Sequence, residues 1–174
     1  GVGLQADGKV VVAGTTLSDE DTVFDFAVAR YLSDGTLDTN FDGDGKVITD
    51  FGTPDNQRTD EATGVVIQDN GRIIVGGTSK LLFREDFALV GYNSDGSLDP
   101  TFGSGGKVIS SFDDGTSSNP DDGIAAAVAL QTDGKIVVAG HLLTQQTHFA
   151  LTRYTKDGEL DDTFGAGGKV TTDF

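Results

Sequence analysis

The sequence predicts an all-β protein made of three similar units, and three observations support this. One set of motifs occurs three times along the 174 residues. Each copy has short runs of Val, Ile, Leu and Phe separated by turns, and the chain holds 25 Gly. No segment shows the 3.6-residue apolar period with capping residues that predicts a helix.

The clearest motif is a turn followed by an apolar strand. It reads DGKVVVAG at residues 7–14, NGRIIVGG at 70–77 and DGKIVVAG at 133–140. Gly8, Gly71 and Gly134 mark these copies at a constant spacing of 63 residues. Internal repeats of this length indicate that each copy is one supersecondary unit that packs on its neighbours.

Further motifs complete each copy. They are the apolar runs 26–31, 87–92 and 149–154, the DG turns 34–38, 95–99 and 157–161, and the GKV segments 45–47, 106–108 and 168–170. The predicted organisation follows from them: units at residues 1–51, 64–112 and 127–174, joined by acidic connections at 52–63 and 113–126.

Each unit resolves into four short strands, which the middle copy places at 64–68, 72–76, 87–92 and 107–112. The Asn-Gly or Asp-Gly pair between the first two strands predicts a type I′ hairpin, with positive φ at Gly8, Gly71 and Gly134. Apolar residues on both faces of a strand indicate that each small sheet is covered on both sides, as propeller blades are. The predicted fold is therefore all-β and β-propeller-like, with three four-stranded blades forming part or half of a propeller.

The third copy reads DGKIVVAG, FALTRY and DGELDDTFGAGGKV, and the other two copies are similar. In these motifs, over essentially the whole chain, the sequence resembles the delta-60 repeat family of bacterial proteins. The resemblance implies a β-propeller-like array in long proteins that are exported or surface-associated, and it implies no defined catalytic role. The first copy departs from the pattern at residues 41–45, FDGDG, where the others read FGSGG and FGAGG.

Composition excludes several classes of function. The 12 Lys and Arg residues against 28 Asp and Glu residues give a net charge of −16, which repels nucleic acids and anionic membrane surfaces. No apolar run is long enough for membrane insertion. The chain has no Cys, so it has no disulfide or thiolate site. Its start at Gly1 and its lack of Met indicate a processed product or a piece of a longer polypeptide.

The first copy has the densest set of oxygen ligands, formed by Asp42 and Asp44 with Asp34 and Asp38 nearby. Calcium takes six to eight oxygens, several of them from carboxylates, so this turn is the predicted metal site. The spacing does not fit an EF-hand loop. The alternative is a solvated hairpin whose aspartates favour positive φ.

Three other groups of residues are candidates for function. Arg30 and Arg153, replaced by Gly91 in the middle copy, bind an anion or pair with a local carboxylate. His141 and His148 occur in one copy only, where they either serve a metal or acid–base role or are exposed loop residues. Acidic residues in the connections are predicted to contact a partner: Asp19, Glu20, Asp21, Asp60, Glu61, Asp121 and Asp122.

Three functional hypotheses follow. The leading one is a non-enzymatic extracellular module for binding, adhesion or assembly, with a protein or glycan partner. The alternatives are a propeller lyase or hydrolase with its site in the channel mouth, and a calcium-stabilised structural array. Three blades are not expected to close a ring alone, because end blades expose apolar faces. The chain is expected to form a six-bladed homodimer or to continue into further repeats.

Overall fold

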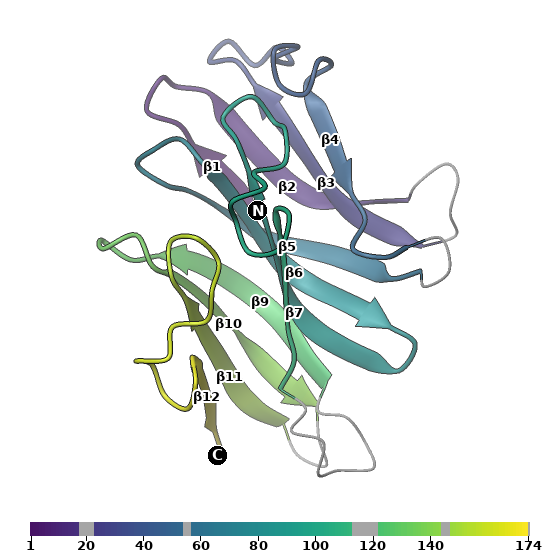
Figure 1. The fold of residues 1–174 in the computed structure, drawn as a ribbon. Coiled ribbons are helices and arrows are strands. Elements are labelled where there is room, and N and C mark those ends of the chain that lie inside the picture. Colours follow the sequence, from purple (N-terminus) through teal and green to yellow (C-terminus); the bar gives the residue numbers. More distant parts are fainter. Residues whose placement is uncertain (18–22, 54–56, 113–121, 144–146, 174) are drawn as a thin grey trace.

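A computed structural model describes residues 1–17, 23–53, 57–112, 122–143 and 147–173. In this part of the chain the secondary structure is entirely β, arranged as three four-stranded antiparallel sheets (Figure 1). None of the described segments is a helix that is long and apolar enough to cross a membrane. The all-β, three-blade prediction is confirmed.

The strands of each sheet follow one another in sequence order, which is the meander of a propeller blade. Blade 1 contains β1 (Val2–Leu4), β2 (Val10–Leu17), β3 (Phe24–Tyr31) and β4 (Lys46–Thr49). Blade 2 contains β5 (Thr59–Ile67), β6 (Ile73–Leu81), β7 (Arg84–Tyr92) and β8 (Lys107–Ser110). Blade 3 contains β9 (Asp122–Leu130), β10 (Ile136–Leu143), β11 (Thr147–Tyr154) and β12 (Lys169–Thr172).

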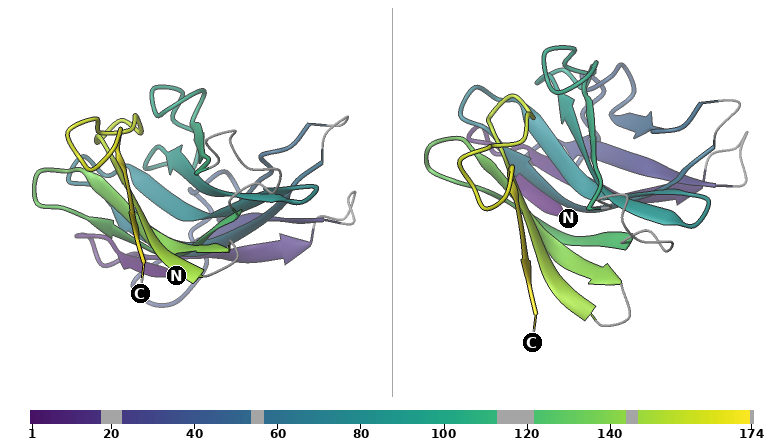
Figure 2. Two further views of the ribbon diagram at one scale, coloured as in Figure 1. Left: turned by 90° about the horizontal axis from the view of Figure 1, so that it is seen from below. Right: turned by 60° about the horizontal axis from the view of Figure 1, so that its bottom comes forward.

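The three blades stack face to face with blade 2 in the middle (Figures 1 and 2). Successive side chains of a strand point to opposite faces of its sheet. Thus Ile73 and Val75 of β6 join the apolar layer against blade 1, whereas Ile74 joins the layer against blade 3. This two-sided burial explains why the strand motifs are continuously apolar instead of alternating.

A phenylalanine of one blade packs against a glycine of the next blade in both layers. The ring of Phe26 lies 2.7 Å from where a Cβ on Gly77 would stand, and the ring of Phe87 lies 2.9 Å from a Cβ on Gly140. A second ring completes each contact edge to face, with Phe51 and Phe112 at centroid distances of 5.1 Å from Phe26 and Phe87. The close approach of the blades therefore requires glycine at these positions.

The hairpin glycines adopt positive φ as predicted: 84° at Gly8, 86° at Gly71 and 83° at Gly134. The type I′ assignment is wrong, however, because that turn needs positive φ at two successive residues, and Asp7 does not have it. Instead, the amide of Gly8 donates to Gln5 O at 2.9 Å, closing a four-residue turn with glycine in the left-handed position. Asp7 supports the turn by accepting from the amide of Lys9 at 3.2 Å.

The first three strands of the middle blade are longer than the sequence predicts, whereas β8 ends at Ser110, two residues earlier than predicted. β5 begins at Thr59, inside the predicted acidic connection, because a bulge between Ala62 and Gly64 lets pairing with β6 continue past the glycine. β6 and β7 extend to a tight turn where Leu82 has a φ of 55°. The sequence signal ended early because polar residues replace the apolar run at 78–80.

Substituting Gly77 tests the close packing of the blades. We expect Gly77→Ala to destabilise the fold by about 1–3 kcal/mol, because the new Cβ would stand 2.0 Å from Glu61 O and 2.7 Å from Phe26. Gly14 holds the same position in blade 1, where a Cβ meets nothing of the same chain within 4 Å, so Gly14→Ala should be neutral or slightly stabilising at protein dilutions where no second copy covers this face. Urea unfolding of both variants checks this, and equal losses would contradict the packing argument.

Candidate functional site

Each outer blade holds one arginine against the phenylalanine of its last turn. On β3, Arg30 Nε donates to Asp38 Oδ2 at 2.9 Å, and the guanidinium lies 4.7 Å from the Phe41 ring centroid. On β11, Arg153 Nε donates to Asp161 Oδ2 at 2.7 Å in the same arrangement, over Phe164. Both predicted anion-binding arginines are thus paired with a local carboxylate, which is the alternative that the sequence left open.

In the middle blade, the residue directly before β6 supplies the arginine, in place of a residue on the third strand. Gly91 stands where the other blades have arginine, and Arg72 stands where they have Lys9 and Lys135. Arg72 Nε donates to Asp99 Oδ2 at 2.6 Å, and its guanidinium lies 5.8 Å from the Phe102 ring centroid. Sequence comparison alone misses this exchange, because only the pairing of β6 with β7 brings positions 72 and 91 together.

These arginines also join neighbouring blades. Arg30 Nη1 donates to the main-chain oxygen of Ser94 in blade 2. Arg72 Nη1 reaches blade 3, where it donates to Lys156 O at 3.0 Å and to Asp157 Oδ1 at 2.9 Å. Each contact therefore orders a turn within one blade and fixes that turn against the next blade.

The carboxylates that face the guanidiniums have pKa values below the ordinary value for aspartate, so they stay ionised at lower pH than an exposed aspartate does. Burial by itself would raise the pKa of Asp99, but hydrogen bonds from Thr101 and Arg72 outweigh it, so the net pKa is lowered. At Asp161, the hydrogen bond from the Thr163 hydroxyl is the largest cause of a strongly lowered pKa, followed by the hydrogen bond from Lys135. This ionised state is the one that pairs with arginine.

The aspartates of the predicted calcium turn have separate roles and do not act as one set of ligands. Asp38 is paired with Arg30, whereas Asp34 accepts from the Thr36 hydroxyl and Asp44 from the amide of Lys46. Asp42 has a φ of 48°, as the alternative of a solvated hairpin expects. These four side chains do not converge on one point within ligand distance.

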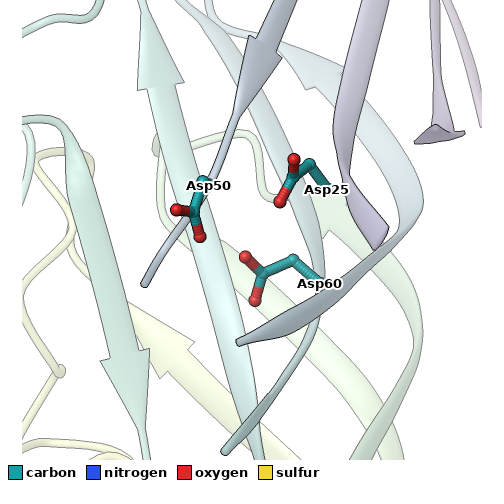
Figure 3. A group of neighbouring side chains, drawn as sticks. All are labelled: Asp25, Asp50 and Asp60. Atoms are coloured by element: carbon teal, nitrogen blue, oxygen red, sulfur yellow. The ribbon is translucent and has the colours of Figure 1, made fainter. Parts of the chain in front are cut away.

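A different acidic group does converge. Asp25 on β3, Asp50 directly after β4, and Asp60 on β5 each offer a carboxylate oxygen, and these oxygens all lie within 4.8 Å of one another (Figure 3). Among the described residues, this is the group of three that could hold a metal ion. Two residues come from blade 1 and one from blade 2, so the group lies at the junction between the blades. Asp25 and Asp60 are buried.

Within this group, burial disfavours the charged form of Asp60. Its Oδ2 accepts from the amide of Phe51 at 2.8 Å, while its buried Oδ1 has no hydrogen-bond partner. Burial is the main cause that raises the pKa of Asp60, and the neighbouring charge of Asp50 raises it further. The hydroxyl of Ser79 lies close enough to oppose this increase, as do the Phe51 amide and Arg58, but they do not cancel it.

Sequence reasoning assigned Asp60 to a partner-binding loop and did not single out Asp25 or Asp50. The available signal was the comparison of copies, since Ser111 stands at the position of Asp50 and Gly123 at that of Asp60. Comparison of the copies did not reveal the group, because the three aspartates lie in different motifs. Only the packing of β5 on blade 1 joins them.

The remaining predicted residues are placed separately. Asp60 and Glu61 lie in β5, and Asp122 begins β9, so the prediction that these three are loop residues is wrong. Asp122 accepts from the amide of Glu85 at 3.0 Å. Four of the predicted partner-contact residues fall outside the described part of the chain: Asp19, Glu20, Asp21 and Asp121.

The two histidines lie on adjacent strands and not on a shared loop. His141 on β10 pairs with Phe149, and His148 on β11 pairs with Leu142. This register places the histidines on opposite faces of blade 3, where they do not share a ligand. His148 Nδ1 lies 2.5 Å from Asp173 Oδ1 instead.

The meander sheets, their repeated turns and the arginine contacts between them define a β-propeller repeat protein. Comparison with known families agrees: a family model described as a domain of unknown function (DUF5122) β-propeller matches residues 5–41, 68–102 and 131–164. These segments cover more than half of the chain, which therefore belongs to this family. No curated protein matches the chain.

Replacing Arg72 tests its contact with Asp99 in the middle blade. We expect Arg72→Ala to lower the free energy of unfolding by about 3 kcal/mol, because it leaves the buried carboxylate of Asp99 without its cation. The control is Lys9→Ala at the equivalent position of blade 1, where the lost partner Asp7 is exposed, so less than about 1 kcal/mol should be lost. Similar losses in guanidinium unfolding would contradict the assignment.

Neutralising Asp60 tests the cost of its buried charge. Because the pKa of Asp60 is raised in the folded state, the carboxyl favours folding below its unfolded pKa, and this advantage is lost as pH rises through the folded value. In EDTA at pH 7, we expect Asp60→Asn to unfold at a higher temperature than the wild-type protein. The difference should narrow as the pH falls toward 4. A wild-type protein that is more stable at pH 7 in EDTA would contradict this.

Proposed function

We propose that the chain is a non-catalytic β-propeller scaffold, that its three blades are one arc of a ring, and that a second copy closes this ring. The single observation that carries the proposal is the exposure of Phe149. Phe26 and Phe87 are 0% exposed because the next blade covers them, whereas Phe149 holds the same register position in blade 3 and is 57% exposed.

The opposite end of the arc offers the complementary face. Val75 and Val138 face the preceding blade and are 0% exposed, whereas their equivalent in blade 1, Val12, is 40% exposed. A shallow hollow on this side of blade 1 is lined by Val12, Ala27, Ala29 and Ile48 among others. The face that would receive Phe149 is thus apolar and open.

Polar contacts always join one face of a blade to the opposite face of the next blade, so the two open faces are complementary and not identical. The hydroxyl of Thr49 lies 2.6 Å from that of Tyr92 in the next blade. Lys107 Nζ donates to Asp50 O of the preceding blade at 2.5 Å, and Lys169 Nζ donates to Ser111 O at the same distance. A two-fold dimer repeats this head-to-tail contact twice and gives a closed ring of six blades.

The contacts that the repeated polar residues make support a scaffold role over a catalytic one. The Arg–Asp–Phe contacts, the turn aspartates and the lysines at the blade junctions are all engaged in holding the fold. We place this scaffold outside the cell, with a protein or glycan as its partner. The resemblance to exported bacterial repeat proteins and the strongly acidic composition support that part of the proposal.

Light scattering coupled to size exclusion tests ring closure. At micromolar concentration, we expect a mass of twice 18.1 kDa for the purified chain. Phe149→Asp should give a folded monomer, because it puts a charge into the contact between copies. Phe83→Asp is the matched control, since Phe83 lies in the β6–β7 turn and is 87% exposed.

Two results would overturn the proposal. One is a stable wild-type monomer that binds no dye specific for exposed apolar surface. The other is loss of the dimer in Phe83→Asp as well as in Phe149→Asp, which would show a nonspecific effect of the added charge.

A further inference from the structure

We infer that Asp25, Asp50 and Asp60 form a divalent-cation site, suited to calcium, that fastens blade 1 to blade 2. All three residues belong to one chain, so the inference does not depend on how the ring is closed. The site also differs from the turn around Asp42 that the sequence favours.

The spacing of the oxygens fits one calcium ion. Calcium binds oxygen at about 2.3–2.6 Å, so two ligands on opposite sides of the ion stand about 4.6–5.2 Å apart. The three carboxylate oxygens lie within 4.8 Å of one another, which is inside that limit. Magnesium demands near-ideal octahedral geometry and gives up its water reluctantly, so a buried group of carboxylates suits calcium better.

A second observation comes from Asp60. Its side chain is fully buried, and its Oδ1 makes no hydrogen bond of normal length and angle, although the Ser79 hydroxyl lies close by. In Figure 3 the carboxylates of Asp25, Asp50 and Asp60 point toward a common space. Buried carboxylate oxygens are normally hydrogen-bonded or bound to a cation. Asp60 Oδ1 faces two other carboxylates, and a bound cation would offset the repulsion between these like charges.

The cationic side chains nearby are committed to other atoms. Arg58 Nη1 donates to the Ser79 hydroxyl at 3.2 Å and lies 3.9 Å from Asp86. Lys107 Nζ donates to the main-chain oxygen of Asp50 and not to its carboxylate. Both side chains therefore border the acidic group without entering it.

The equivalent position at the second junction is built differently. Asp86, Ser111 and Gly123 replace Asp25, Asp50 and Asp60, so one carboxylate stands where the first junction has three. Asp86 is neutralised by Arg84 at 3.1 Å. On Gly123 a Cβ would lie 3.3 Å from the Phe112 ring, so the apolar layer occupies the place of the third carboxylate. Only the first of these two junctions thus gathers the charge that a divalent cation needs.

Calcium titration of the full chain tests the inference. Starting from EDTA-treated protein, we expect one calcium ion per chain by isothermal titration calorimetry. We also expect a rise in Tm of about 5–10 °C when calcium is a hundredfold above its Kd. Magnesium should bind more weakly. The variants are Asp60→Asn and Asp50→Ser, the second of which introduces the residue that stands at 111 in the second junction.

Each variant should weaken calcium binding at least a hundredfold and so lose most of the rise in Tm at the same calcium concentration. The matched control is the double variant Asp42→Gly, Asp44→Gly, which gives this turn the glycines of the other copies and removes two carboxylates elsewhere in blade 1. It should keep both the stoichiometry and the Tm rise. No calcium-dependent Tm rise in the wild-type protein would overturn the inference. So would a rise that survives in Asp50→Ser and disappears in the double variant.

Discussion

The contact of a phenylalanine with the glycine of the following blade is the constraint on which this structure depends. Phe26 and Phe87 fit only because Gly77 and Gly140 carry no side chain, and this lets the sheets approach closely enough to bury both faces of blade 2. A single four-stranded sheet of this size would bury little apolar surface alone. Stability is therefore shared between neighbours, and the polar contacts at the junctions can form only after the sheets have stacked.

The sequence predicted what repeats. The strands, the glycines with positive φ and the propeller-like stacking each follow from a motif present in all three copies, such as the one around Gly71. The sequence predicted strand lengths and turn type less well, because each depends on a local detail of one residue or one bulge. The bulge after Ala62 lengthened β5 beyond its apolar signal, and the hairpin turn type rested on the φ of Asp7, which its neighbour Gly8 does not determine.

The candidate metal centre shows a different limit. Asp25, Asp50 and Asp60 belong to three strands or strand ends in two blades, so no linear spacing relates them. The sequence instead directed attention to the turn around Asp42, where carboxylates are dense along the chain but are used as turn supports and ion-pair partners. Proximity in sequence measures ligand density poorly in a stacked array, because the densest packing occurs between units.

The exchange of Arg72 for an arginine at position 91 has a consequence for how such arrays change over time. Both positions of the exchange lie in the same repeat, so duplicating a whole repeat preserves one guanidinium over each phenylalanine. Recombination between copies with a crossover between these two codons would produce a blade with two arginines in one place, or with none. The first kind of hybrid would crowd two guanidiniums against one phenylalanine, and the second would leave the turn carboxylate without a guanidinium.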